Sequence, residues 1–379
     1  MTASPRSLRR RAAWAAPVLT AAAVGGATLL PSTASASAHP VLPARTAAQL
    51  LAAVQTSTVT ALSGTIVETA RLGLPSLPGA DSSAALSWQT LVTGTHTARV
   101  WLAGPDQQRL ALLGQLAESD VVHNGRDVWT YASGTQVVGH TQLPAEKVAT
   151  TAPEKAPDLT RYTPQGAADQ ALKAIDPSTA VTVDRTARVA GHPAYTLVLT
   201  PRDTRSTVRK VLIAIDAKYS VPLRVQVFGK AAAPAFETAF TNISYRRPAA
   251  SVFAFTPPKG AQVTQDVLGS LVPTTAAADK PATGTGTAKP SPTVLGTGWA
   301  SVLVLPAAKD GSSPLAGLTG SKHGGSVASA LDSLTTTLPN GDKLLQSALV
   351  NVLVAKDGRV LLGAVSPALL EQAAAGQLG

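Results

Sequence analysis

Short runs of alternating apolar and polar residues recur between residues 62 and 263, and they constrain the fold more than any other feature of the sequence. Three clear examples are 195–200 (YTLVLT), 211–217 (VLIAIDA) and 223–229 (LRVQVFG). Because successive side chains of a strand point to opposite faces, these runs predict strands with one apolar face. Turn residues at 104–106, 118–120, 123–127, 133–135, 190–193, 201–205, 216–222 and 228–234 indicate antiparallel hairpins between the strands.

Two segments have helical spacing instead. Residues 46–59 place Leu50, Leu51 and Val54 on one helical face, with Thr46 as a candidate N-cap. The second begins at Pro164, a favoured residue at the first helical position, and ends before Asp176. The apolar face of the sheet must be covered by these helices, by a ligand or by both. The alternation alone is equally compatible with a packed core and with a cavity.

The first 38 residues have the three parts of a secretory signal. Basic residues at 6–11 precede an apolar run at 12–30, and the small-residue sequence SASA ends at Ala38. We therefore expect cleavage after Ala38 and a mature protein that is exported, to the cell envelope or the extracellular space. The alternative is an uncleaved membrane anchor, because the apolar run is long enough to span a bilayer.

Residues 273–293 have the Pro, Gly, Thr and Ala content of a flexible linker. This composition predicts a large domain at 39–272 and a small α+β domain at 294–379. In the small domain, 298–306, 326–334, 347–355, 359–365 and 367–375 are the expected elements. The hairpin at 347–365 is apolar on both faces, so we expect both faces to be covered.

Few residues suggest an enzyme or a cofactor. The chain has no cysteine, and its six histidines form no helical pair of the kind that holds zinc. Neither a nucleophile elbow nor a phosphate-binding P-loop occurs. We interpret Glu68, Asp106 and Asp127, at strand ends or turns, as carboxylates that are solvated or hydrogen-bonded within a turn. We interpret His123 beside Asp120 and Asp127 as structural or solvated. The sequence therefore predicts a protein that is not an enzyme and has no metal or cofactor.

The net charge of +10 does not indicate nucleic-acid binding. Four of the arginines lie within the first 11 residues, and the other basic residues are scattered among acidic ones. Such binding needs a concentrated basic face, usually with aromatic side chains that stack on bases. We expect no nucleic-acid partner.

The order of segments resembles that of the LolA-like periplasmic lipoprotein carriers. In 97–114 and 119–133, the matching residues are Pro105, Arg109, Gly125, Trp129 and Tyr131. Downstream, 191–202, 210–229 and 236–263 follow the family's pattern to its ending at Phe255, Pro257, Pro258 and Gly260. The resemblance covers about residues 44–265 and rests on the ordered series rather than on one motif.

The resemblance implies an α+β fold: a strongly curved, incomplete antiparallel β-barrel (a half-barrel) with a helical lid. It also implies a non-enzymatic protein that holds lipid or lipoprotein acyl chains for transport. The related RseB-like proteins share the fold, add a linker and a small C-terminal domain, and bind a membrane-anchored anti-sigma factor. The two-domain layout predicted here is similar to theirs, so an anti-sigma factor is the alternative partner.

The leading hypothesis is an exported lipid-binding protein with an apolar cavity. The alternation predicts that the cavity is lined by Val100, Leu102, Leu110, Leu112, Trp129, Tyr131, Leu197, Leu199, Ile213, Ile215, Val225, Val227 and Phe253.

Overall fold

The computed structural model describes residues 40–74, 93–114, 117–143, 157–173, 175, 177–265, 292–307 and 334–378. All of them belong to one compact unit, Pro40–Gly379. The predicted signal peptide lies outside the described residues. The same holds for the linker apart from its last two residues, and for the helix expected at 326–334 apart from its last residue. The division into two domains therefore stays a prediction.

The larger of two sheets has 12 strands in the order β12-β6-β5-β4-β3-β2-β1-β11-β10-β9-β8-β7. Every pairing is antiparallel except that of β12 with β6, which is parallel. The strands are β1 (Ala61–Ala70), β2 (Gly94–Ala103), β3 (Gln107–Leu113), β4 (Glu118–Asn124), β5 (Asp127–Ala132), β6 (Val137–Gln142), β7 (Thr179–Val189), β8 (His192–Pro201), β9 (Lys210–Asp216), β10 (Pro222–Phe228), β11 (Phe236–Ser244) and β12 (Gln262–Gln265).

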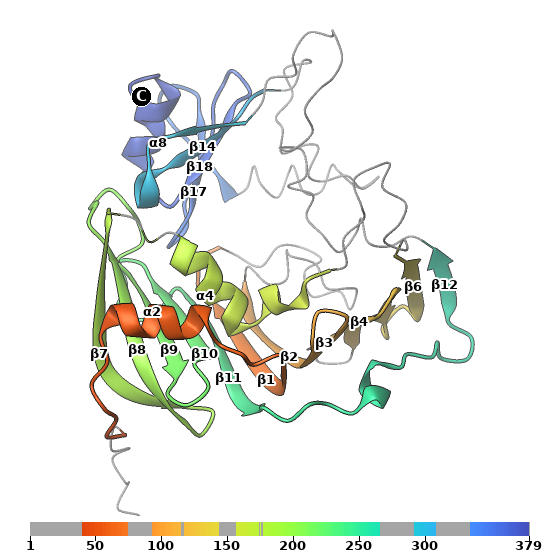
Figure 1. Ribbon diagram of the computed structural model, residues 1–379. Coiled ribbons are helices and arrows are strands. Elements are labelled where there is room, and N and C mark those ends of the chain that lie inside the picture. Colours follow the sequence, from red (N-terminus) through yellow and green to blue (C-terminus); the bar gives the residue numbers. More distant parts are fainter. Residues whose placement is uncertain are drawn as a thin grey trace, which may run out of the picture. The chain divides into compact units, whose positions relative to one another are not determined.

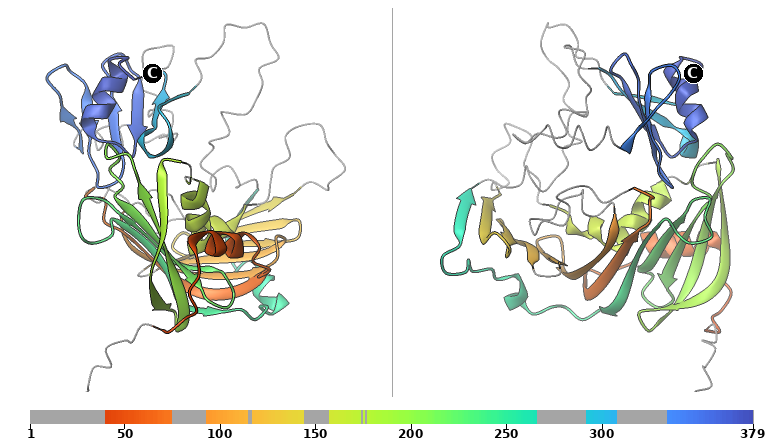
Figure 2. Two further views of the ribbon diagram at one scale, coloured as in Figure 1. Left: turned by 60° about the vertical axis from the view of Figure 1, so that its left-hand side comes forward. Right: turned by 180° about the vertical axis from the view of Figure 1, so that it is seen from behind.

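This sheet is strongly curved and does not close into a barrel (Figures 1 and 2). Its inner, concave face carries the helices α2 (Ala47–Gln55) and α4 (Pro164–Lys173) and the 3-10 helix η1 (Leu159–Tyr162). α2 lies over β7, α4 over β10 and β11, and η1 over β3. The predicted half-barrel with a helical lid is confirmed.

Both predicted helices are present at the expected positions. Thr46 and Gln49 form a capping box at the start of α2: the Thr46 hydroxyl accepts from Gln49 N, and the Gln49 side chain accepts from Thr46 N. The helix ends at Gln55 rather than Val59, because Thr56 and the β-branched residues after it favour an extended chain. α4 begins at Pro164 as predicted.

The prediction of a turn at 118–120 is wrong, because these residues open β4. Polar residues occupy this strand because they have partners in the sheet. The Asp120 carboxylate pairs with Arg109 Nη2 at 3.0 Å, and Glu118 N donates to Ser133 Oγ at 2.8 Å. The turns predicted at 104–106 and 133–135 do lie between strands, as expected.

Gly64 gives the centre of the sheet its close packing. A Cβ atom at this position would lie 2.5 Å from Asn242 O and 2.8 Å from the Phe240 ring. The ring of Phe240 therefore rests on the β1 backbone, next to a bulge in the pairing of β1 with β11. Only glycine leaves room for this contact.

The smaller sheet has six strands in the order β13-β14-β18-β17-β16-β15. Its helix α8 (Pro367–Ala374) packs Leu369 and Leu370 against Leu353 and Leu361 of the sheet. The elements expected at 298–306, 347–355, 359–365 and 367–375 are present. The strands are β13 (Thr293–Leu295), β14 (Val302–Leu305), β15 (Thr336–Thr337), β16 (Lys343–Leu345), β17 (Asn351–Val354) and β18 (Val360–Gly363), and the 3-10 helix η3 is Gly298–Ala300.

The loop between β8 and β9 joins the smaller sheet by backbone contacts. Ser206 forms an isolated β-bridge with Val365, and Thr207 N donates to Ala364 O at 2.9 Å. The Thr207 hydroxyl donates to Leu349 O. The side chain of Leu349 is 8% exposed and packs in the same apolar cluster as α2 and α4. The C-terminal segment therefore contributes to the core beneath the helices.

Candidate functional site

The strand register shows which side chains share the concave face, because residues directly opposite in antiparallel strands point to the same side. One row crosses β8, β9, β10, β11, β1 and β2 through Leu197, Ile213, Val225, Thr238, Glu68 and His96. The row is apolar beneath the helices and polar at the middle of the sheet. The concave face therefore combines an apolar surface with a central polar group.

Most of the predicted lining residues lie on this concave face. Beneath α2 and α4, they pack against Leu50, Val54 and Ala168 of those helices. This set is Leu197, Leu199, Ile213, Ile215, Val225 and Val227. In the other half of the sheet, Val100, Leu102 and Leu110 pack near Leu159 and Tyr162 of η1, and Leu112 lines a small cleft.

Trp129, Tyr131 and Phe253 do not join them. Thr130 continues the concave row of Leu110 and Val121, so Trp129 and Tyr131 on either side of it point to the convex face. Trp129 stacks on His140 there, with ring centroids 3.8 Å apart. The alternation of 127–132 predicts that the aromatic residues face the cavity. This phase is wrong, because Val128 is the fully buried residue of the strand.

Phe253 belongs to the 3-10 helix η2 (Ala250–Phe253), which contacts β3 and β4. Arg109 Nη1 donates to Val252 O at 3.3 Å, and Arg109 lies in the convex row with Trp101 and Val122. η2 therefore packs on the convex face, where Phe253 is 1% exposed. The burial of Phe253 comes from this contact and not from the cavity.

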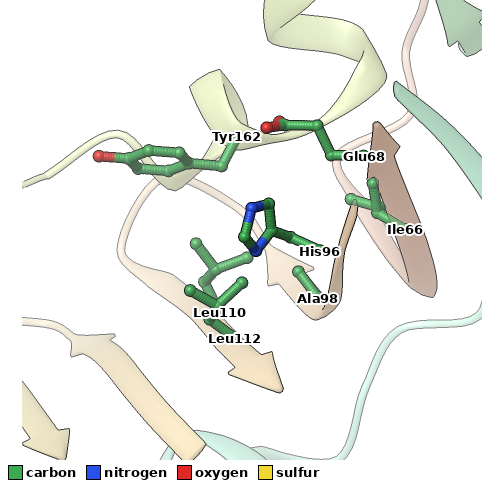
Figure 3. A pocket seen from close by; sticks show the side chains of 7 residues that line it. All are labelled: Ile66, Glu68, His96, Ala98, Leu110, Leu112 and Tyr162. Atoms are coloured by element: carbon green, nitrogen blue, oxygen red, sulfur yellow. The ribbon is translucent and has the colours of Figure 1, made fainter. Parts of the chain in front are cut away.

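A small cleft lies on the concave face beneath η1 (Figure 3). It is lined by Ile66, Glu68, His96, Ala98, Leu110, Leu112 and Tyr162. Its free volume of about 20 Å³ is close to the space that one water molecule needs. In this closed arrangement the cleft cannot hold an acyl chain.

Glu68 is the carboxylate of this cleft. Its side chain extends from β1 toward Tyr162 above the ring of His96 (Figure 3). Within the described residues, Glu68 Oε1 is buried without a hydrogen-bond partner. Burial raises the pKa of Glu68 from 4.5 to about 7, because an apolar environment disfavours the charged form.

The interpretation of Glu68 as solvated or hydrogen-bonded in a turn is therefore wrong, because its side chain is half-buried within β1 and Oε1 is fully buried. Glu68 has the same strand parity as Leu62, Ile66 and Ala70, all of which are buried. That parity could have revealed its place on the apolar face. Thr238 was also missed: it faces Glu68 across the β1–β11 pair, is 2% exposed, and its hydroxyl has no partner among the described residues.

η1 and α4 form one piece over the concave face. A Cβ atom at Gly166 would lie 2.6 Å from Thr160 O, so the first turn of α4 packs directly on η1. Leu159 N donates to Gln108 Oε1 of β3 at 2.8 Å, which fixes η1 to the sheet. Burial raises the pKa of the Tyr162 phenol in the same piece. We call residues 159–173 the lid.

The other titratable clusters are structural. Asp216 accepts hydrogen bonds from Lys218 N, Tyr219 N and the Tyr245 hydroxyl, and pairs with His192 Nδ1 at 3.0 Å. Burial and the hydrogen bond to Asp216 raise the pKa of Tyr245 far above its usual range. This network fixes the turn between β9 and β10.

The grouping of His123 with Asp120 and Asp127 does not form. His123 lies on the concave face opposite Gln108, whereas Asp120 and Asp127 lie on the convex face and pair with Arg109 and His140. Among the described residues, no group of three or more His, Asp or Glu side chains could hold a metal ion. No helix in the described ranges is long and apolar enough to cross a membrane.

The fold and the site together define a curved sheet whose apolar concave face is covered by helices. No family model matches the chain, and no curated protein matches it. The chain is similar to the solved MucA/MucB complex of Pseudomonas aeruginosa, with 14% identity over 86% of this chain and 96% of that one, and a TM-score of 0.42.

Two further solved structures are similar to parts of the chain. An uncharacterised conserved protein from Thermus thermophilus is 14% identical over 58% of this chain and 99% of its own, with a TM-score of 0.32. A LolA superfamily protein from Nitrosomonas europaea is 11% identical over 56% of this chain and 99% of its own, with a TM-score of 0.22. LolA-like proteins are therefore among the similar structures, as the sequence resemblance led us to expect.

Proposed function

We propose that the protein binds the acyl chains of a lipid or lipoprotein on its concave face, for carriage or sensing in the cell envelope. The observation that carries this proposal is a difference in side-chain size between the concave face and α4, one of the helices that cover it. The face presents large apolar side chains, including Leu197, Ile213 and Val225, whereas α4 covers it with small residues whose buried members are Pro164, Gly166 and Ala168.

This difference in size makes α4 the part of the lid that is most easily replaced, because η1 also buries Leu159. The free energy of burial scales with apolar area, so Gly and Ala contribute little to closure. An acyl chain contributes about 0.8 kcal/mol for each methylene buried. A chain of about a dozen carbons is then sufficient for affinity near micromolar after the costs of association. The closed cleft of about 20 Å³ requires the lid to move before such a chain enters.

The test is native mass spectrometry of the protein purified from its own host, followed by titration of the delipidated protein with dansyl-undecanoic acid. We expect a retained lipid mass and saturable binding that oleate competes away. Protein that carries no lipid and does not bind the acyl probe would contradict the proposal.

We also propose that residues 1–38 are removed on export. The support is the basic, apolar and small-residue order of this segment. N-terminal sequencing of the exported protein should begin within a few residues of His39. Recovery of the intact N-terminus in the membrane fraction would favour the anchor instead.

A second candidate function is binding of a membrane-anchored anti-sigma factor, with lipid as the input. MucB is seen in complex with MucA in the solved structures. The feature of this chain that favours a protein partner is an apolar row on the smaller sheet: Leu303, Leu362 and Val352 share a face and are only half-buried. Val352→Glu should abolish binding of an anti-sigma factor's extracytoplasmic segment and leave acyl-probe binding unchanged.

A further inference from the structure

Two buried polar atoms face the middle of the concave sheet without partners. Glu68 Oε1 and Thr238 Oγ1 belong to residues directly opposite each other on β1 and β11, and neither has a hydrogen bond within the described structure. A buried polar atom without a partner costs folding free energy, and a ligand that supplies the partner recovers it. A ligand with a suitable polar group could therefore be recognised by this pair of side chains.

The surroundings restrict the ligand group to a small one. Glu68 lines a cleft with a free volume of about 20 Å³, whose apolar walls are Ile66, Ala98, Leu110 and Leu112. Thr238 is not part of this lining and lies directly across the β1–β11 pair from Glu68. His96 closes one side, with Nε2 held 2.7 Å from Thr93 O. A hydroxyl group is the size of a water molecule, so it fits this space beneath the lid.

The donor and acceptor capacities also select a hydroxyl. A hydroxyl group donates to one oxygen and accepts from another, so it can satisfy Glu68 and Thr238 together. An ester carbonyl only accepts, so it cannot satisfy the ionised form of Glu68. A phosphate is larger, and its negative charge is repelled by an ionised carboxylate in apolar surroundings. Because burial raises the pKa of Glu68 to about 7, this carboxyl can accept or donate near neutral pH.

We propose that Glu68 and Thr238 recognise the free hydroxyl group of an acylated alcohol, such as a diacylglycerol, whose chains occupy the apolar part of the concave face. This inference rests on the proposed function, because it assigns the polar end of the same ligand. It goes further by predicting selection among lipids with identical acyl chains.

The experiment compares three lipids that share their chains: 1,2-dioleoylglycerol, its 3-O-methyl ether and dioleoylphosphatidic acid. Each competes with dansyl-undecanoic acid for the wild type, Glu68→Leu, Thr238→Val and the control Glu237→Leu. Glu237 lies on the opposite face, where it accepts from Gln226 Nε2. Glu68→Leu removes a carboxyl group that has one buried, unpaired oxygen, so we expect this variant to fold.

We expect the wild type and Glu237→Leu to bind dioleoylglycerol at least tenfold more tightly than either of the other lipids. Glu68→Leu should bind dioleoylglycerol and its methyl ether equally, and Thr238→Val should lose part of the preference. An undiminished preference in Glu68→Leu, or equal binding of all three lipids by the wild type, would overturn the inference and leave lipid binding standing. If none of the lipids and no acyl probe binds, the proposed function itself fails.

Discussion

At the scale of single residues, the protonation of Glu68 sets the charge of the central cleft and affects the stability of the protein. A carboxyl group whose pKa is higher in the folded than in the unfolded chain keeps its proton longer in the folded state. The folded state then binds more protons between the two pKa values, and stability falls as pH rises through that window. For Glu68 the window runs from 4.5 to about 7.

We therefore predict that the free energy of unfolding falls between pH 4.5 and 7, by up to about 3 kcal/mol from this residue at roughly 1.4 kcal/mol per pH unit. Glu68→Gln should remove this part of the fall and be more stable than the wild type at pH 8. Urea unfolding at several pH values measures both. Asp120, whose pKa burial raises to about 6 against the lowering effect of Arg109, contributes a fall in both proteins.

Identical pH profiles for the wild type and Glu68→Gln would contradict the assignment. Glu68 also shows what sequence pattern misses. The sequence places Glu68 on the same strand face as Leu62, Ile66 and Ala70. A charged residue near the end of an apolar strand is nevertheless usually solvated, so the pattern alone does not predict burial. Only the pairing of β1 with both β2 and β11 reveals that neighbouring strands bury it on both sides.

At the scale of elements, a buried hydrogen bond ties the lid to β3 in addition to its apolar contacts with the sheet. The hydrogen bond from Leu159 N to Gln108 Oε1 is buried, and Gln108 Nε2 in turn donates to Pro105 O at 3.2 Å. Removing the acceptor leaves Leu159 N unsatisfied in the closed state but solvated in the open state. The loss therefore weakens closure specifically.

We predict that Gln108→Leu increases the rate of acyl-probe uptake about tenfold, which corresponds to roughly 1.4 kcal/mol. The matched control is Gln107→Leu on the convex face, where the side chain bonds Asn124 and Arg247. Stopped-flow fluorescence measures the uptake rates. An equal rate for Gln108→Leu and the wild type would show that this bond does not hold the lid.

The elements themselves were largely predictable, because alternation, caps and turns are local signals. These local signals are sufficient to predict where both helices begin, at Thr46 and Pro164, and where most turns of the large sheet lie. The phase of β5 did not follow, since Val128 and Thr130 face the concave side while Trp129 and Tyr131 pack near the ring of Phe255 on the convex side. Which phase is buried depends on a segment more than 100 residues away, and local pattern does not contain that information.

At the scale of the whole molecule, the C-terminal segment is predicted as a separate domain but packs into the core of the large sheet. Trp299 Nε1 donates to Thr179 Oγ1 at 2.7 Å, and Ala348 N donates to Leu72 O at 2.8 Å. Leu349 reaches the cluster that α2 and α4 cover. Sequence composition marks a linker but cannot show whether the segments that it joins pack together.

We predict that limited proteolysis cuts first between residues 273 and 293, where the sequence has few apolar residues to bury. The two fragments should then elute together in size-exclusion chromatography, because the contacts of Thr207, Leu349 and Trp299 hold them. Fragments that separate without denaturant would show that the C-terminal segment is an independent domain.

The central claim is that an acyl chain binds between the lid and the concave face. The cysteine-free sequence allows a direct test, in which Ala168→Cys on α4 and Val225→Cys on β10, two residues of one apolar cluster, are joined by oxidation. The measurement is the affinity of the oxidised and reduced double variant for dansyl-undecanoic acid, with each single variant as control. We predict that oxidation lowers the affinity at least tenfold and that reduction restores it. Equal binding by the locked and the reduced protein would place the lipid elsewhere and contradict the account.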